Sequence, residues 1–325
     1  MSAVFIPLSG FLGAGKTTLM LKAAELLKKR GLKAVCIAND QGGMLVDAMA
    51  AAQRGFPVGQ VAGGCFCCKF DELTETIHAL LASERPDVII AEAAGSCTDL
   101  EATVVRPLLA LHGDRIRPLG VTTVIDPWRL RQWYGRESRF TPEIDYIFRK
   151  QLEDASCLLL NKSDLLPPDE AETLLAKLRA DIPDVPIAAV SSRVGTGVAA
   201  WLDRALAGFG APHSVLDVDY DVYAAGEAQL GWLNMSLTLE GSGFDAAEAC
   251  EALMNELSDA LAAAGAEIAH AKLWAQNDSD AMKLNVVRGG DAPAAEGPAR
   301  RPWPSDRAAV WLSARVRSES GLLRQ

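Results

Sequence analysis

The strongest constraint on the fold of this chain is a glycine-rich segment near its start. Residues 10–17 match the pattern G-x-x-x-x-G-K-[ST], between an apolar run, Val4–Leu8, and a run with helical spacing, Thr17–Arg30. The glycines let the backbone wrap tightly, so that its N–H groups converge on phosphate oxygens, and the start of the helix adds partial positive charge. Because both the pattern and its context fit, we predict a phosphate-binding loop here in preference to a chance glycine-rich turn.

Strand-like and helix-like segments alternate along the first two thirds of the chain. This alternation predicts an α/β domain over residues 1–208, with the doubly wound, mostly parallel sheet of P-loop NTPases. The predicted strands are Val4–Leu8, Ala34–Ala38, Val88–Ala91, Gly120–Ile125, Cys157–Leu160 and Ile187–Val190. The predicted helices are Thr17–Arg30, Asp71–Ala82, Leu100–Leu111, Pro142–Glu153, Glu170–Ala180 and Gly197–Ala207.

The pattern changes beyond Gly208, where residues 209–229 begin with the composition of a linker. Strands grouped around one helix then predict a smaller α+β domain, ferredoxin-like, over residues 230–325. Its predicted elements are strand Leu230–Leu239, helix Ala246–Ala264, and strands Ala266–Ala275, Ala281–Arg288 and Ala308–Arg317. The intervening segment Gly289–Asp306 is rich in Gly, Pro and Ala, and we expect it to form a loop.

Charge and hydropathy exclude two classes of partner. The 325-residue chain has a formal net charge of -10, whereas nucleic-acid backbones are bound by clustered Lys and Arg. No run approaches the roughly 18 apolar residues that a membrane-spanning helix needs. The chain also enters its first strand without a basic leader. We therefore expect a cytoplasmic protein that binds neither nucleic acid nor membrane.

The phosphate loop and the third predicted strand supply the expected phosphate and magnesium ligands. Lys16 can bridge the β- and γ-phosphates, and the Thr17 hydroxyl can ligate Mg²⁺. Glu92 ends the strand at the ligand edge of the sheet and can hold Mg²⁺ through water, while the Gly95 N–H can sense the γ-phosphate. Taken alone, Glu92 would be read as a solvated carboxylate. We assign catalysis to Lys16, Glu92 and Gly95, and expect nucleotide contacts from Gly10, Gly13, Ala14, Gly15, Lys16, Thr17 and Thr18.

A second motif concerns the base of the nucleotide. The fifth predicted strand ends in Asn161-Lys162-Ser163-Asp164, which resembles the N-K-x-D guanine signature of GTPases. The Asp164 carboxylate can accept hydrogen bonds from guanine N1 and the exocyclic amine, a donor pair that adenine lacks. Asn and Asp also favour turns, but the position at a strand end of a phosphate-loop domain favours base binding by Asn161, Lys162 and Asp164.

Three cysteines within four residues, Cys65, Cys67 and Cys68, lie between the second and third predicted strands. Thiolates are soft ligands that suit zinc and similar ions. We expect Cys65 and Cys67 to project the same way from an extended chain, with Cys68 on a bend. Three thiolates leave a tetrahedral ion one ligand short, which is typical of a transfer or regulated site. A redox relay is the main alternative.

The remaining cysteines give weaker signals. Cys36, Cys157 and Cys250 are read as small buried hydrophobic residues. Cys97, which follows the Glu92–Gly95 segment, stays open between a structural and a functional role.

The segment Asn39–Asp47 follows the second predicted strand, where GTPases carry a switch that reorganises around the γ-phosphate and Mg²⁺. Either Asp40 or Asp47 could reach Mg²⁺, and Asp40 could instead supply the missing ligand to the cysteine site. One segment would then touch both ions, so that hydrolysis could alter metal affinity. A polar turn with an Asn cap explains Asp40 equally well.

Together these motifs resemble the CobW family of metallochaperone GTPases, relatives of the urease and hydrogenase nickel-insertion GTPases. The phosphate loop, Gly63-Gly64-Cys65-Phe66-Cys67-Cys68, the Glu-x-x-Gly segment at Glu92 and N-K-x-D occur in the family's order between residues 3 and 207. The resemblance implies GTP-dependent handling of zinc, cobalt or a related metal. It also implies a client metalloprotein or corrinoid-pathway protein, and a possible homodimer.

Two segments depart from the family's pattern. The usual switch sequence is Asn-Glu-Phe-Gly-Glu-x-Gly-x-Asp, whereas here Asp40 replaces one Glu and Gly43 removes the other. Ala93 and Ala94 stand where the family tends to have two threonines, which predicts slow or partner-dependent hydrolysis.

The sequence thus predicts a Mg²⁺-dependent GTPase that couples hydrolysis to binding and transfer of a transition metal, zinc or one like cobalt. One alternative is a nucleotide-gated protein chaperone of a metalloenzyme or corrinoid protein, with a purely structural cysteine site. A small-molecule kinase shares the phosphate loop, but it gives no reason for Asn161–Asp164.

Overall fold

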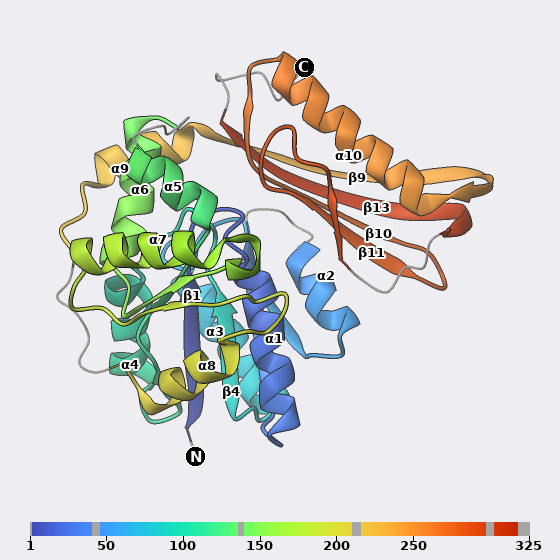
Figure 1. The fold of residues 1–325 in the computed structure, drawn as a ribbon. Helices are drawn as coiled ribbons and strands as arrows, with labels where there is room; N and C mark the ends of the chain where they lie inside the picture. Colours follow the sequence, from blue (N-terminus) through green and yellow to red (C-terminus); the bar gives the residue numbers. More distant parts are fainter. Residues whose placement is uncertain (1, 41–45, 136–139, 210–215, 297–301, 318–325) are drawn as a thin grey trace. The chain divides into compact units, whose positions relative to one another are not determined.

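The computed structural model describes residues 2–40, 46–135, 140–209, 216–296 and 302–317. The chain divides into two compact units, Met1–Gly226 and Glu227–Gln325. Each unit has a hydrophobic core of its own, and both are drawn in Figure 1.

The first unit is built on a parallel sheet whose strands run in the order β3-β2-β4-β1-β6-β7-β8, with β5 also paired to β1. The strands are β1 (Ala3–Ser9), β2 (Ala34–Asp40), β3 (Val58–Ala62), β4 (Val88–Glu92), β5 (Ile116–Pro118), β6 (Thr122–Ile125), β7 (Cys157–Leu160) and β8 (Ile187–Ala189). The pairs along this order are parallel. The predicted α/β class is therefore confirmed, and each of the six predicted strands is present.

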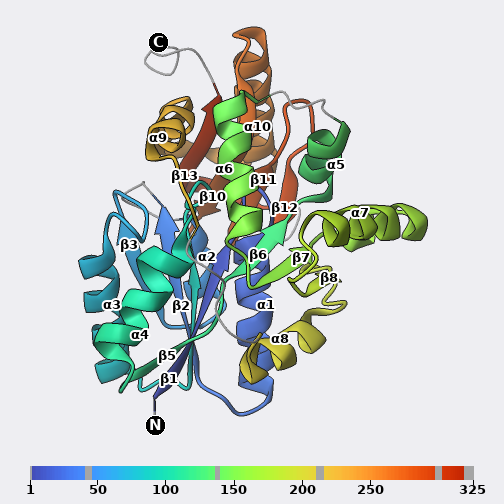
Figure 2. The same cartoon turned by 90° about the vertical axis from the view of Figure 1, so that its left-hand side faces the viewer.

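Helices cover both faces of this sheet (Figure 2). The helices of this part of the chain are α1 (Lys16–Lys29), α2 (Val46–Gln53), α3 (Phe70–Ser83), α4 (Arg106–His112), α5 (Pro127–Gly135), α6 (Pro142–Glu153), α7 (Pro168–Asp181), α8 (Val198–Ala207) and α9 (Tyr220–Ala228). Helices α3 and α4 pack on one face, where Leu73, Ile77 and Leu108 join buried strand residues such as Phe5 and Ile37. Helix α1 lies on the other face beside α8 (Figure 2).

The sequence missed the short or weakly patterned elements β3, β5, α2, α5 and α9. Strand β3 has Gly59 and Gln60 in its interior, and β5 has three residues, so neither carries a run of β-branched side chains. The region predicted as one helix, Leu100–Leu111, is instead a π-helix, η1 (Glu101–Val105), followed by α4. Pro107 at the start of α4 lacks the N–H that would continue the regular hydrogen-bond ladder, which accounts for the change of register.

The segment with linker composition, residues 209–229, contains α9, and the first compact unit extends to Gly226. Helix α9 packs on α6, since a Cβ added at Gly226 would lie 2.6 Å from the Glu143 carbonyl oxygen. A glycine is therefore required at this contact.

The second unit is α+β, as predicted. Its antiparallel sheet has the order β12-β11-β10-β13-β9, and helix α10 lies across one face of it (Figure 1). The elements are β9 (Leu230–Asp245), α10 (Ala246–Ala263), β10 (Glu267–Gln276), β11 (Ala281–Val286), β12 (Ala294–Glu296) and β13 (Pro304–Arg317). The segment expected to be a loop, Gly289–Asp306, therefore contains β12 and the start of β13. Asp245 caps α10 by accepting hydrogen bonds from the Ala247 and Glu248 N–H groups. Within the described part of the chain, no helix combines the length and the apolar character needed to cross a bilayer.

Candidate nucleotide site and metal centre

The phosphate loop has the backbone conformation that its glycines make possible. Gly10, Gly13 and Gly15 have φ values of 131°, 74° and 94°, in the region where a Cβ is disfavoured. A Cβ at Gly10 would lie 2.1 Å from the Val124 carbonyl oxygen, and one at Gly15 would lie 2.4 Å from Asn161 Nδ2. The loop therefore packs directly against the ends of β6 and β7.

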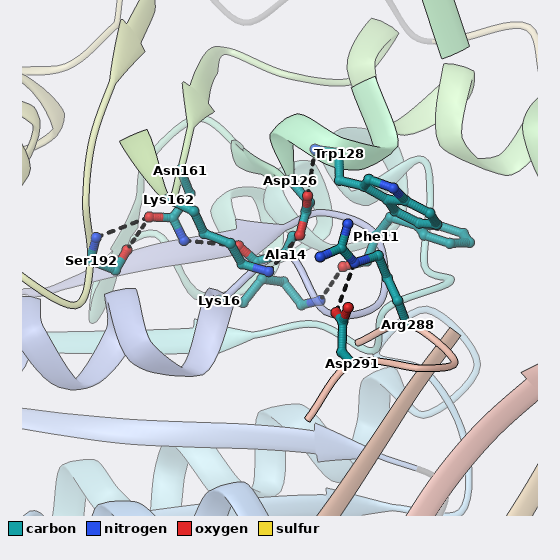
Figure 3. Close-up of polar contacts among 10 residues, drawn as sticks. All are labelled: Phe11, Ala14, Lys16, Asp126, Trp128, Asn161, Lys162, Ser192, Arg288 and Asp291. Carbon is teal, nitrogen blue, oxygen red and sulfur yellow. Dashed lines mark hydrogen bonds and ion pairs between the residues drawn. The ribbon is translucent and has the colours of Figure 1, made fainter. Parts of the chain in front are cut away.

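Lys16 begins α1 and lies across the loop. Its Nζ donates to the carbonyl oxygen of Gly10 at 2.7 Å, and to that of Phe11 at 3.3 Å (Figure 3). The side chain is buried, with 5% exposure. This arrangement holds a cation at the helix N-terminus, where the N–H groups of the first turn, including that of Thr18, favour an anion. Loop, lysine and helix start together form a phosphate cradle.

A hydroxyl and a carboxylate lie beside this cradle. Thr17 Oγ1 donates to Glu92 Oε1 at 3.0 Å, and both residues are buried. Oxygen donors of these two kinds are what Mg²⁺ prefers in nucleotide sites, so Thr17 and Glu92 would hold that ion. Asp47 lies buried in the first turn of α2, and its magnesium role stays a prediction. Asp40 ends β2, but its side chain lies outside the described residues.

Asn161, at the end of β7, joins the loop after β8 to the phosphate loop. Its Nδ2 donates to the Ala14 carbonyl at 2.8 Å, and its Oδ1 accepts from the Ser192 N–H at 2.9 Å and the Ser192 hydroxyl at 2.8 Å (Figure 3). Asn161 thus orders the walls of the nucleotide site.

Asp164 is held at the mouth of this region. Its carboxylate accepts from Ser191 Oγ at 2.6 Å and from Arg193 Nη2 at 2.8 Å. Burial tends to raise the pKa of Asp164, but the hydrogen bonds from Ser191 and Arg193 outweigh it and lower that pKa. The carboxylate is therefore kept charged, in the form that accepts hydrogen bonds from a guanine.

Lys162 adopts a left-handed conformation with φ of 56°, and its Nζ pairs with Asp126 Oδ2 at 2.5 Å (Figure 3). The other oxygen of Asp126 accepts from the Trp128 N–H at 2.7 Å. Sequence reasoning missed Asp126. Its place directly after β6 was an available signal, because the carboxyl ends of parallel strands share the ligand edge.

The three clustered cysteines come together, but not as expected. The sequence predicts an extended chain, whereas residues 66–69 form a turn in which the Lys69 N–H donates to the Cys65 carbonyl at 2.9 Å. The turn places Cys65 Sγ 2.6 Å from Cys67 Sγ and 3.2 Å from Cys68 Sγ, and the Cys67 and Cys68 sulfurs lie 3.9 Å apart. All three sulfurs lie within 4.8 Å of one another, a spacing that suits one shared metal ion.

The thiols in and beside this cluster differ in how readily they lose a proton. Hydrogen bonds from Cys67 and Cys97 lower the pKa of Cys65, and the same bonds to Cys65 raise the pKa values of its two partners. Cys65 is therefore the first thiolate, which is the form that binds a metal. Burial raises the pKa values of Cys36, Cys157 and Cys250 to about 12, as expected of buried hydrophobic cysteines.

Asn39 connects the cysteine segment to the strand that carries Glu92. Its Nδ2 donates to the carbonyl oxygens of Val61 at 2.9 Å and Gly64 at 2.6 Å, and its Oδ1 accepts from the Ala94 N–H at 3.1 Å. One buried amide thus bridges the residue before Cys65 and the residue before Gly95. The sequence placed Asn39 in a switch segment without indicating these contacts.

The parallel sheet, the phosphate cradle and the loops at the ends of β4 and β7 define a P-loop nucleotide-binding protein. A family model described as CobW/HypB/UreG, nucleotide-binding domain, matches residues 4–188, and the chain belongs to this family.

The chain is similar to several known proteins. The chain is 30% identical over 207 residues to the zinc chaperone CobW of Pseudomonas aeruginosa, covering 54% of this chain and 51% of that protein. It is 28% identical over 174 residues to the zinc chaperone YeiR of Escherichia coli, covering 51% and 48% respectively. The matches thus span about half the length of these relatives. The Zn(II)-bound YjiA GTPase of E. coli aligns with a TM-score of 0.44 and 16% identity, covering 100% of this chain and 97% of that one.

Proposed function

We propose that this protein hydrolyses GTP with Mg²⁺ and couples hydrolysis to the binding and transfer of a transition metal to a client protein. The observation that carries the proposal is the Asn39 bridge, because it joins the cysteine segment at Gly64 to Ala94, beside the expected γ-phosphate sensor. Zinc is the first metal to consider, since the related proteins are zinc chaperones. Cluster thiols also need a reducing compartment, such as the cytoplasm.

The chain's own residues would do the following in hydrolysis. Lys16 neutralises charge on the β- and γ-phosphates from its place across the loop. Mg²⁺, when bound, would add further charge stabilisation on the transferred phosphoryl group. Thr17 and Glu92 would hold that ion, and the Gly95 N–H would contact the γ-phosphate and detect its loss. Catalysis is thus largely positional and electrostatic.

The base preference follows from Asp164. Its charged carboxylate accepts two hydrogen bonds from guanine, which adenine cannot supply. GTP should therefore bind more tightly than ATP, and Asp164→Asn should reduce the ratio of the two affinities by roughly tenfold or more, since each lost charged hydrogen bond costs about 1.5–3 kcal/mol. Nucleotide titration of the two proteins measures this ratio.

The decisive experiment measures the rate of GTP turnover under two conditions, at a buffered concentration of free zinc and in the absence of zinc. The proteins are the wild type, a Cys65→Ser/Cys67→Ser/Cys68→Ser variant, and a Cys250→Ala variant as control for loss of a buried cysteine. We expect the ratio of the two rates to differ from one in the wild type and the control, and to be one in the triple variant.

Equal metal response in all three proteins would contradict coupling through the cysteine cluster. Turnover that responds to a protein client and not to metal would instead favour a nucleotide-gated protein chaperone with a structural cysteine site.

A further inference from the structure

Cys97 lies two residues beyond Gly95 and is held in place from two sides. Its N–H donates to the Ala94 carbonyl at 2.9 Å, which closes a tight turn. The buried amide of Gln151 on α6 donates to the carbonyl oxygens of Gly95 at 3.0 Å and Cys97 at 2.8 Å. The position of Cys97 is therefore set by the backbone that follows Glu92.

The Cys97 thiol points into the cysteine cluster, where it forms hydrogen bonds with the thiols of Cys65 and Cys67. Cys97 and Cys65 also belong to the same buried core, against which Cys67 packs. Cys97, from the segment after β4, thus meets Cys65 and Cys67 of the segment before α3, whose sulfurs lie with that of Cys68 within 4.8 Å of one another.

Building on the proposed function, we propose that Cys97 is the fourth ligand of a four-thiolate metal site with Cys65, Cys67 and Cys68. Such a site suits zinc, which takes four thiolates in tetrahedral geometry. The three clustered cysteines supply only three of the four ligands of a tetrahedral ion, and Cys97 supplies the fourth. Binding releases the thiol protons to solvent and involves no change of oxidation state.

The exposure of the four cysteines gives the site one open side. Cys68 is exposed, Cys67 is half-buried, Cys65 has 9% exposure and Cys97 has none. A metal ion would therefore meet Cys68 and Cys67 first and reach Cys97 last. The bond to Cys97 closes the site, and breaking it is the first step of release toward the surface.

The fourth ligand also connects the metal to the nucleotide. Gly95 packs against the phosphate loop, since a Cβ there would lie 2.5 Å from a side-chain carbon of Leu12. A metal bond at Cys97 fixes the segment that includes Gly95, and the γ-phosphate fixes the same segment from its other end. By linkage, GTP and metal must then change each other's affinity by the same factor.

The experiment uses the full chain, reduced and loaded with one equivalent of zinc. X-ray absorption counts the sulfur ligands, and chelator competition measures zinc affinity. Cys97→Ala and Cys97→Ser test the ligand, Cys157→Ala controls for loss of a buried cysteine, and Asp99→Asn tests an oxygen ligand from the same segment.

We expect four sulfur ligands at about 2.3 Å in the wild type, Cys157→Ala and Asp99→Asn, and three in both Cys97 variants. Zinc affinity should fall by roughly tenfold or more in the Cys97 variants. In the wild type it should differ by roughly fivefold or more between GDP and a non-hydrolysable GTP analogue, and this difference should fall below about twofold without Cys97.

Three sulfur ligands in the wild type, with unchanged affinity in Cys97→Ala, would overturn the fourth-ligand assignment and leave the proposed function standing. Failure of the wild type to bind zinc or cobalt at all would overturn both. The wild-type ligand count does not depend on whether any variant folds.

Discussion

At the scale of single residues, Asn161 shows how one side chain organises the nucleotide site. It is 2% exposed, and its amide joins the phosphate loop at Ala14 to the loop after β8 at Ser192. Replacing Asn161 removes this hydrogen-bond partner from the buried Ala14 carbonyl and the buried Ser192 N–H. A buried polar group without a hydrogen bond lowers the free energy of unfolding. Its role is therefore both structural and functional.

We expect Asn161→Ala to lower the free energy of unfolding by about 2 kcal/mol, in line with the penalty for unsatisfied buried groups. The variant should also weaken GTP and ATP binding alike, because the phosphate loop loses its support. Urea unfolding and nucleotide titration measure the two effects. Ser192→Ala, which removes one of the three hydrogen bonds, should lose less stability, and equal losses would contradict this account.

At the scale of elements, Arg129 on α5 ties the phosphate loop to α6. Its guanidinium lies over the rings of Phe11, Phe140 and Phe148, at 5.1, 4.4 and 5.3 Å from their centres, and Nη2 donates to Asp145 Oδ1 at 2.5 Å. Burial lowers the pKa of Arg129 and the charge of Asp145 opposes it. Two helices and the loop thus share one buried cation.

Arg129→Met is expected to cost up to about 3 kcal/mol of stability, since it removes the buried partner of a partly buried ion pair and leaves the Asp145 carboxylate uncompensated. Denaturant unfolding checks this value. The double variant Arg129→Met/Asp145→Leu should recover part of the loss, because no charge is then stranded. A double variant as unstable as the sum of both single variants would argue against the ion pair as the cause.

The carboxylate of Asp154, directly after α6, accepts hydrogen bonds from the N–H groups of Leu100 and Glu101. Burial raises its pKa to about 8, the Leu100 hydrogen bond opposes this, and the nearby charges of Asp99 and Glu101 add to it. Because the folded pKa lies above the ordinary value of 3.8, the fold favours the protonated form. The stability that protonated Asp154 contributes to the fold is fully present below pH 3.8, declines as pH rises, and is lost above about pH 8.

The melting temperature of the wild type should therefore fall relative to that of Asp154→Asn as pH rises from 5 to 8, and the difference should level off above 8. Thermal unfolding across this range gives the comparison. Asp203 forms an exposed ion pair with Arg30. The melting temperature of Asp203→Asn should therefore change with pH in the same way as that of the wild type. Parallel curves for Asp154→Asn would refute the assignment.

At the scale of the whole molecule, the two units have separate cores. The second is secured by Arg315, which is 3% exposed. Its guanidinium donates to the Leu230 carbonyl at 2.6 Å, pairs with Glu227 at 2.5 Å and lies 3.6 Å from the centre of the Trp232 ring. These contacts join the two ends of this unit's chain, β9 and β13.

Arg315→Met should therefore lower the free energy of unfolding of the second unit by about 3 kcal/mol. It should leave the affinity for GTP unchanged. Calorimetry with and without Mg²⁺–GTP distinguishes the two transitions, because the nucleotide stabilises only the unit that binds it. A shift of the nucleotide-stabilised transition in this variant would show that the two units do not unfold independently.

The sequence by itself determined the parts of the site that are contiguous in the chain. The glycines of the phosphate loop, Lys16 and the N-K-x-D segment could be predicted because each needs a particular backbone conformation or donor set within a few residues. The strand-helix alternation gave the α/β class for the same reason, since hydrophobic periodicity is a local property. A turn of a few residues around Cys65 was still misread as extended, because no periodic pattern marks it.

Only the tertiary structure decided how distant segments meet. The neighbouring positions of β2, β4 and β1 place Asn39 beside Ala94, and bring Glu92 to the phosphate loop. They also bring Cys97 into contact with Cys65 and Cys67. Strand order depends on which buried faces pack together across the whole core, and the sequence between two strands carries no record of it. The phosphate loop could therefore be identified from the sequence, whereas its connection to the cysteine cluster required the assembled sheet.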